Sequence, residues 1–352
     1  MTEPLRVAYL QKAPSGHANA CLRALADTGV DLLATVPAPS ASAPFDQGSF
    51  DWIPSQIPMN DGLVRDDLLE QLKRFDPHAL LVVSWDVRSY RLCASALRGR
   101  TIRVLCMDNQ WLRTPRQVLG IATRPLYVQR CFDRVFLPGE RQERFARKLG
   151  FAAAEIDRGF YSADVERFTG IPPLEDDDRR AFLFVGRLVQ SKGIDVLTDA
   201  YARYRSEVDD PWDLVVAGTG VLPPGLASLE GVHALGFVQP GELPGLFARA
   251  SALVLPSRFE PWGVVVHEAV CAGLLVLTTD RVGAADDLVE HETSGYIAPA
   301  GSTDRFLDAL RWAHRLSSGE RSVASSEGIR LSTRFSPQRW ADTVVSMARG
   351  ST

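Results

Sequence analysis

The stretch AFLFVGRLVQSKGIDVLTDAYARYR, residues 181–205, decides the fold class of this chain. Residues 181–185 are continuously apolar and end at Gly186, whereas residues 192–205 have the apolar spacing of a helix. An apolar strand, a short turn and a helix together form the repeating unit of a parallel sheet that is covered on both faces. The same alternation runs through residues 5–148 and restarts after residue 180. The sequence therefore predicts an α/β protein with two parallel-sheet domains in tandem.

The length also favours two domains, because 352 residues exceed what one hydrophobic core usually serves. The segment TGIPPLEDDDRR, residues 169–180, is proline-rich and then acidic, which is typical of a linker. We place the first domain at residues 1–165 and the second at residues 166–335. Residues 336–352 form a third, C-terminal segment that follows the second domain. Residues 37–60 show no clear period and are expected to form a loop. Residues 115–131 are expected to form a helix.

The composition excludes several classes of protein. No apolar run approaches the roughly 18 residues that span a bilayer, and the N-terminus lacks the pattern of a signal peptide. The five cysteines are scattered, which favours a reducing compartment and argues against a structural zinc site. The net charge of −4 and the lack of a matching motif argue against nucleic acid as a partner. We expect a cytoplasmic protein.

Basic residues are concentrated in one segment of the first domain. Residues 98–148 contain 12 Lys and Arg against 4 Asp and Glu, an excess of 8. Such a segment could bind an anionic acceptor or the anionic lipids at the inner face of a membrane. The alternative is a set of solvated, arginine-rich helices.

Several polar loops follow predicted strands. In an open parallel sheet, ligands bind beyond the carboxyl ends of the strands. The loops at this edge are 14–17, 108–111, 186–187, 218–220 and 260–263. If the two domains face each other, all of these loops can line one cleft.

The loop VGRLVQSKG places two cations beside the start of a helix. Arg187 follows Gly186 directly, and Lys192 opens the next helix. Fixed cations at a helix N-terminus favour a phosphate, although an ordinary surface loop is the alternative. The chain has neither a P-loop nor the glycine fingerprint of dinucleotide-binding dehydrogenases.

The stretch FEPWGVVVHE, residues 259–268, contains two carboxylates. Gly263 allows close approach of a ligand, and the N–H groups of Gly263, Val264 and Val265 could face an anion or sugar hydroxyls. Glu268, inside the helix, could accept two hydrogen bonds from a ribose diol, and Glu260 could reach another part of the same ligand. Alternatively, Glu260 is a helix-terminus carboxylate and Glu268 belongs to a structural ion pair.

The spacing of Glu260 and Glu268 resembles the E-x7-E signature of retaining GT-B glycosyltransferases, family 4. The segments FLFVGRLVQSKGIDVLTDAY, LVVAGTG and HALGFVQPGELPGLFARASALVLPS resemble the same family in order and spacing, as does GLLVLTTDRVGAADDLVEHETSGYIAPAGS downstream. The resemblance is strong over roughly 155–350 and weak before that. It implies a GT-B fold in which two Rossmann-like domains face each other across a cleft.

The resemblance also implies roles for matching residues. Arg187 and Lys192, beside Gly186, would hold the donor diphosphate. Glu260 would contact the transferred sugar. Arg187, Lys192 and Glu260 would together serve catalysis. Glu268 would bind the ribose, and the main chain of Val238 would lie by the nucleobase. The amides of 263–265 would contact sugar or phosphate, and 336–352 would form a helix that crosses back to the first domain, the acceptor-binding one.

The first domain departs from the family pattern. Only Gly16 remains where many members have two glycines; it could still approach a phosphate, and His17 follows it. The region CMDNQWLR lacks the histidine that many members carry. We expect Asp108 to contact the acceptor or the transferred sugar and to take part in catalysis, with Asn109 and Trp111 as further candidates.

Together these features predict a retaining hexosyltransferase that uses a nucleotide-diphosphate sugar, with no metal and no cofactor. We expect it to act in bacterial surface glycan or glycolipid biosynthesis, on a glycan or lipid-linked acceptor. The alternatives are a glycosyltransferase for a soluble small molecule, a nucleotide-sugar-binding protein and a sugar-nucleotide epimerase.

Overall fold

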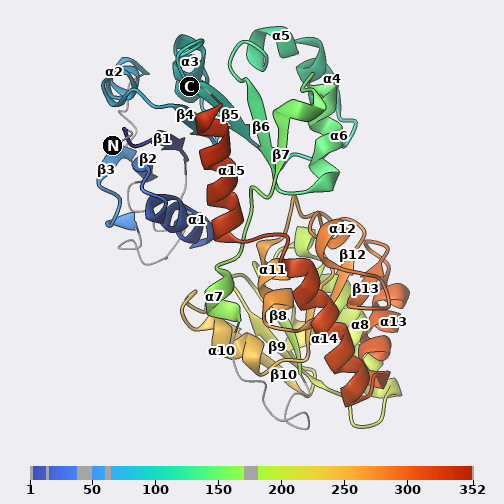
Figure 1. Ribbon diagram of the computed structural model, residues 1–352. Helices are drawn as coiled ribbons and strands as arrows, with labels where there is room; N and C mark the ends of the chain where they lie inside the picture. Colours follow the sequence, from blue (N-terminus) through green and yellow to red (C-terminus); the bar gives the residue numbers. More distant parts are fainter. Residues whose placement is uncertain (1–2, 13–15, 38–49, 60–64, 170–180, 351–352) are drawn as a thin grey trace. The chain divides into compact units, whose positions relative to one another are not determined.

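The computed structural model describes residues 3–12, 16–37, 50–59, 65–169 and 181–350 (Figure 1). The chain divides into two compact units. The first unit comprises Met1–Ser162 with Phe335–Thr352, and the second comprises Ala163–Arg334. The division therefore falls at 162/163 and 334/335, beside the expected boundaries at 165/166 and 335/336. Most of the predicted linker, residues 170–180, lies outside the described residues.

The first unit is built on a seven-stranded parallel sheet in the order β3-β2-β1-β4-β5-β6-β7. The strands are β1 (Arg6–Leu10), β2 (Asp31–Pro37), β3 (Ser55–Met59), β4 (Ala79–Val82), β5 (Ile102–Cys106), β6 (Arg134–Leu137) and β7 (Ile156–Arg158). The helices are α1 (Gly16–Asp27), α2 (Arg65–Phe75), α3 (Arg88–Ala96), α4 (Pro115–Ala122), α5 (Arg124–Tyr127), α6 (Glu140–Lys148) and α15 (Pro337–Arg349).

The last helix of the chain, α15, completes the core of the first unit. Its residues Trp340, Val344 and Met347 are buried in the same cluster as Val7 and Tyr9 of β1. The other face of the sheet packs a second cluster on α2, α3 and α6. Strands buried on both faces explain why their sequences are continuously apolar rather than alternating.

The second unit repeats the architecture with a six-stranded parallel sheet in the order β10-β9-β8-β11-β12-β13. Its strands are β8 (Ala181–Val185), β9 (Asp213–Ala217), β10 (Val232–Gly236), β11 (Ala252–Leu255), β12 (Leu275–Thr279) and β13 (Gly295–Ala298). Its helices are α7 (Val165–Phe168), α8 (Ile194–Glu207), α9 (Pro224–Ala227), α10 (Leu243–Ala248), α11 (Val264–Cys271), α12 (Ala285–Leu288), α13 (Thr303–Arg315) and α14 (Ser318–Ser332). The predicted α/β fold with two parallel sheets is confirmed.

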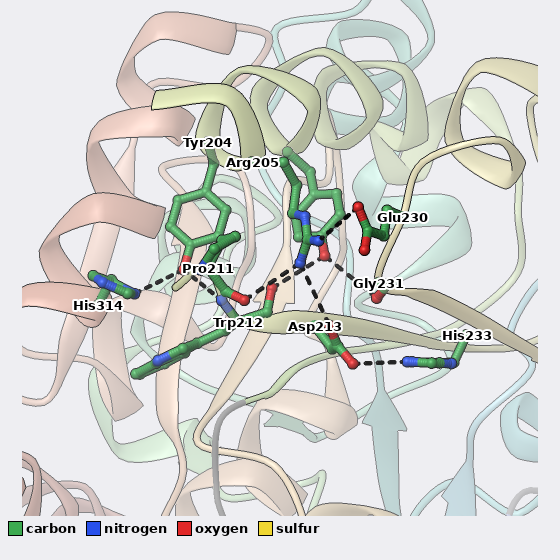
Figure 2. Close-up of polar contacts among 10 residues, drawn as sticks. Tyr204, Arg205, Pro211, Trp212, Asp213, Glu230, Gly231, His233 and His314 are labelled. Carbon is green, nitrogen blue, oxygen red and sulfur yellow. Dashed lines mark hydrogen bonds and ion pairs between the residues drawn. The ribbon is translucent and has the colours of Figure 1, made fainter. Parts of the chain in front are cut away.

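A polar network at the amino ends of β9 and β10 stabilises this second sheet (Figure 2). Arg205, in the last turn of α8, pairs with Asp213 at 3.5 Å and with Glu230 at 3.8 Å. Asp213 in turn lies 2.8 Å from His233. Because ligands bind at the opposite, carboxyl edge of such a sheet, we assign this charged cluster a structural role.

The structure corrects two local predictions. Residues 55–59, expected in a loop, form the edge strand β3, where Pro58 is tolerated because an edge strand leaves one side unpaired. The helix expected over 115–131 is two short helices, α4 and α5, separated at Thr123. Pro125 accounts for the break, because it lacks an N–H and restricts the residue before it.

Candidate functional site

Lys192 and Glu260 form an ion pair at the carboxyl edge of the second sheet. Their side chains are each 16% exposed. Lys192 ends the short helix that follows β8, and Glu260 lies in the loop after β11, the strand paired with β8. An added Cβ at Gly186 would lie 3.9 Å from Cε of Lys192. The structure thus brings together Gly186, Lys192 and Glu260, which the sequence predicted for one site.

Glycines hold the Lys192 loop close to the neighbouring strands. Gly193 has φ 68°, and a Cβ there would lie 2.0 Å from the carbonyl oxygen of Pro256 at the end of β11. A Cβ on Gly218, after β9, would lie 1.7 Å from the carbonyl oxygen of Gly186. Only glycine permits these approaches, so the backbone fixes where the Lys192 side chain begins.

Arg187 follows Gly186 in the same loop and is an exposed cation. Its side chain forms no ion pair with any residue that the structure describes, in contrast to Lys192. An exposed guanidinium keeps all its donors for an oxyanion ligand. Arg187 is therefore available for a phosphate group.

The N-terminus of α11 is shaped by Gly263, which adopts φ 98° and caps the helix without a side-chain acceptor. A Cβ at Gly263 would lie 3.2 Å from Cγ of Glu260. The N–H groups of Val264 and Val265 belong to the first turn and have no acceptor within the helix. Both residues are half-buried, so an anion or a hydroxyl could meet these N–H groups.

The loop that carries Glu260 is held by its backbone. The N–H of Glu260 donates to the carbonyl of Arg281 at 3.1 Å, and the N–H of Gly283 donates to the carbonyl of Glu260 at 3.1 Å. These bonds form a short parallel bridge with Val282. The carboxylate of Glu260 is thus presented by a fixed backbone.

Glu268 lies in the second turn of α11 and faces α7. Burial raises the pKa of its carboxyl to about 7, opposed by the charge of Arg167 and assisted by that of Asp164. Glu268 forms no ion pair with a described residue, and Arg167 pairs with Asp164 at 3.7 Å instead. A half-buried carboxylate without a cationic partner is suited to accept hydrogen bonds from a ligand.

Val238 follows β10 at the same edge and is half-buried. The N–H of Gly218 donates to the carbonyl of Gly236 at 2.7 Å, which ties the ends of β9 and β10 together. The loops after β8, β9, β10 and β11 therefore share the carboxyl edge of one sheet. The sequence predicted this position for the loops 186–187, 218–220 and 260–263.

In the first unit, Tyr161 connects two predicted residues. Its hydroxyl donates to Oδ2 of Asp108 at 3.1 Å, and its ring contacts the ring of His17 edge-on with centroids 4.8 Å apart. His17 is the second residue of α1, after Gly16, and burial lowers its pKa to about 4. His17 is thus neutral at physiological pH. Tyr161 was not among the residues that the sequence predicted for the site.

Asn109 and Trp111 lie elsewhere in the first unit. Oδ1 of Asn109 accepts a hydrogen bond from Nε1 of Trp85 at 3.3 Å. The ring of Trp111 stacks on Phe145 with centroids 5.8 Å apart, and Nζ of Lys148 lies 5.1 Å from the Trp111 centroid. The structure places Trp111 against the core rather than beside His17 and Asp108.

Within the described ranges, no three His, Cys, Asp or Glu side chains are grouped so that they could hold a metal ion. All five cysteines are buried free thiols.

Residues 171–328 match the family model described as "Glycosyl transferases group 1". Alpha-D-kanosaminyltransferase of Streptomyces kanamyceticus is 29% identical over 181 residues, 49% of this chain and 45% of that protein. The GDP-mannose-dependent alpha-(1-6)-phosphatidylinositol monomannoside mannosyltransferase of Mycobacterium tuberculosis (strain H37Rv) is 29% identical over 211 residues, 54% of each chain. This chain thus spans about half the length of these curated relatives (45% and 54%).

Among solved structures, that of Anabaena Alr3699/HepE in complex with UDP and glucose superposes with a TM-score of 0.77 at 17% identity. The superposition covers 98% of this chain and 100% of the other. At this identity the likeness concerns the fold. The chain has the GT-B fold of solved glycosyltransferases, with two Rossmann-like parallel-sheet units, and its residues 171–328 match the group 1 glycosyl transferases.

Proposed function

We propose that this chain is a retaining glycosyltransferase that transfers a hexose from a nucleotide-diphosphate sugar without a metal ion. The observation that carries the proposal is the ion pair of Lys192 and Glu260 at the carboxyl edge of the second sheet, in which Lys192 shares its loop with the exposed Arg187. The match of residues 171–328 to group 1 glycosyl transferases supports it, as does the UDP bound in the Alr3699/HepE structure.

The donor diphosphate is held by charge and by backbone donors. Arg187 and Lys192 supply two cations, and the first turn of α11 supplies N–H groups and the positive end of its dipole. A diphosphate competes with Glu260 for the Lys192 ammonium. Glu260 then becomes available to accept a hydrogen bond from a hydroxyl of the transferred sugar.

Glu268 binds the ribose in this proposal. A carboxylate accepts hydrogen bonds from two adjacent hydroxyls only when it is ionised. Because its pKa is about 7, roughly half of the carboxyl groups are protonated at neutral pH before a ligand binds. Donor binding therefore releases protons near neutral pH and strengthens as the pH rises through 7.

The transfer step breaks the bond between the anomeric carbon and the diphosphate oxygen. The acceptor oxygen bonds to the anomeric carbon on the same face, and its proton passes to the leaving phosphate. The cations of Arg187 and Lys192 stabilise the charge that develops on the diphosphate. Glu260, paired with a lysine, positions the sugar and is not assigned as a nucleophile.

The first unit binds the acceptor in this account, through Asp108, Tyr161 and His17. We propose a glycan or lipid-linked acceptor of bacterial surface glycan or glycolipid biosynthesis, reached at the inner face of a membrane. The name of the Mycobacterium tuberculosis relative, a phosphatidylinositol monomannoside mannosyltransferase, supports a lipid acceptor.

Nucleotide release tests the reaction class. A transferase frees nucleotide diphosphate in step with acceptor glycosylation, and the glycosidic product keeps the anomeric configuration of the donor. Interconversion of the donor sugar without an acceptor would indicate an epimerase instead. Donor binding with neither reaction, across glycan and lipid-linked acceptors, would indicate a binding protein.

A further inference from the structure

The helix α4 (Pro115–Ala122) presents its apolar side to the solvent. Val118 and Leu119 are 54% and 65% exposed, and Pro115 and Ala122 are exposed as well. These four residues have the spacing i, i+3, i+4 and i+7, which defines one face of a helix. No residue of α4 is fully buried. An ordinary surface helix turns its apolar side toward the core, whereas α4 turns its apolar side toward the solvent.

The inward side of α4 is held by polar contacts. Oε1 of Gln117 accepts from the N–H of Leu112 at 2.8 Å, and its Nε2 donates to the carbonyl of Gln110 at 2.6 Å. Ile121 packs against the core of the first unit. These contacts fix the rotation of the helix, so its apolar side remains outward.

The helix α5 follows α4 in the chain and contacts it (Figure 1). Leu126 and Tyr127 are 66% and 54% exposed, and Leu112, before α4, is 44% exposed. We call the surface formed by Leu112, Val118, Leu119, Leu126 and Tyr127 the α4–α5 face. Five large apolar side chains within 16 residues, 112–127, form a concentration that is typical of an interaction site.

The charged residues of the segment that carries this face have a single sign. Residues 109–132 contain four arginines, Arg113, Arg116, Arg124 and Arg130, and no Asp or Glu. Arg113, Arg116 and Arg130 form no ion pair with any residue within the described ranges. A positive surface with exposed apolar side chains complements a bilayer that carries anionic lipids.

A pocket of about 530 Å³ lies beside the face. Arg98 and Arg130 line it together with Ser95, Pro125 and Gln129, and Pro125 belongs to α5. Two arginines and two polar side chains fit an anionic group such as a lipid phosphate. The pocket adds a headgroup subsite to the apolar surface.

We propose that the α4–α5 face binds the surface of a membrane that contains anionic lipids, with a headgroup phosphate in the Arg98–Arg130 pocket. No helix of the described part of the chain could span a membrane. Its use in reaching a lipid-linked acceptor rests on the proposed function, whereas vesicle binding itself does not.

The test is flotation of the full chain with phosphatidylcholine vesicles, with and without phosphatidylglycerol. We expect binding to the anionic vesicles that weakens with salt. Leu119→Asp/Leu126→Asp should abolish it, and Arg116→Gln/Arg130→Gln should weaken it roughly tenfold or more. The controls are Val323→Asp, at a position 70% exposed on α14, and Arg74→Gln, exposed on α2; both should bind like the parent chain. Unchanged unfolding temperatures exclude misfolding.

Three results would overturn the proposal. They are a lack of binding to anionic vesicles, equal binding by the variants and the parent, and a dimer in the absence of lipid that Leu119→Asp/Leu126→Asp dissociates. Donor binding is measured separately on the same variants. A chain that binds donors but no vesicles refutes this proposal alone, and one that binds vesicles but no donors refutes only the proposed function.

Discussion

The Lys192 ammonium and the Glu260 carboxylate are paired across the ends of two neighbouring strands, β8 and β11. Their residues are 68 positions apart in the chain, and both side chains are largely shielded from water. A pair of this kind couples stability to ligand binding, because removing one partner takes an ion-pair contact away from the other charge, which is largely shielded from water.

Lys192→Ala should weaken binding of the donor nucleotide diphosphate by roughly 10- to 100-fold, because it removes a charge-assisted contact to phosphate. It should also lower the free energy of unfolding by about 1–2 kcal/mol, because Glu260 loses its ion pair with Lys192. Isothermal titration and denaturant unfolding measure the two effects. Arg205→Ala, at the opposite edge of the sheet, is the control: it should lower stability and leave donor affinity unchanged (Figure 2).

Glu260→Gln should reduce the rate of transfer more than it reduces nucleotide affinity, because the amide cannot accept hydrogen bonds as a carboxylate does. The comparison needs kcat with saturating donor and the Kd of the nucleotide diphosphate alone. An equal loss in both would mean that Glu260 only maintains the loop.

Gly263→Ala should destabilise the second unit by about 1–2 kcal/mol and weaken donor binding. The residue has φ 98°, and the new Cβ would lie 3.2 Å from Glu260, so both backbone strain and crowding oppose it. Gly319→Ala is the matched control, since nothing lies within 4 Å of its Cβ position in α14. If both variants unfold at the same temperature, the backbone argument for Gly263 is wrong.

The stability of the chain should depend on pH through Glu268. Its pKa is about 7 in the folded chain against an ordinary value of 4.5, so the folded state binds the proton more tightly. The stabilisation is complete below about pH 4.5 and is lost as the pH rises through 7. Glu268→Gln should therefore be more stable than the parent at pH 8, by about 1–3 kcal/mol, with near equality at pH 5. A difference that does not vary with pH would contradict the raised pKa.

Tyr161→Phe removes the hydrogen bond to Asp108 and keeps the ring contact with His17. If these residues bind the acceptor, kcat/KM for the acceptor should fall roughly tenfold while donor affinity is unchanged. Tyr296→Phe, in the second unit, controls for loss of a tyrosine hydroxyl elsewhere. Equal kinetics in Tyr161→Phe and the parent would remove Tyr161 from the site.

The sequence predicted the elements of the second unit well because its signals are local. Gly186 ends an apolar strand, and Gly263 precedes an apolar helix, so both turns and the residues beside them were evident. The link from Tyr161 to Asp108 was not predicted, since it joins residues 53 positions apart through a side-chain contact. Trp111 illustrates the same limit, because an aromatic residue after a strand can equally face a ligand or the core.

The central claim is that the carboxyl edge of the second sheet binds a nucleotide-diphosphate sugar. The most direct measurement is the rise in melting temperature with a panel of nucleotide diphosphates and their sugars, for the parent and for Lys192→Ala. A ligand that binds only the folded chain raises the melting temperature according to its affinity and concentration. We expect one nucleotide class to stabilise the parent and to lose most of this effect in the variant. Equal stabilisation of both chains, or none with any nucleotide or sugar nucleotide, would contradict the assignment.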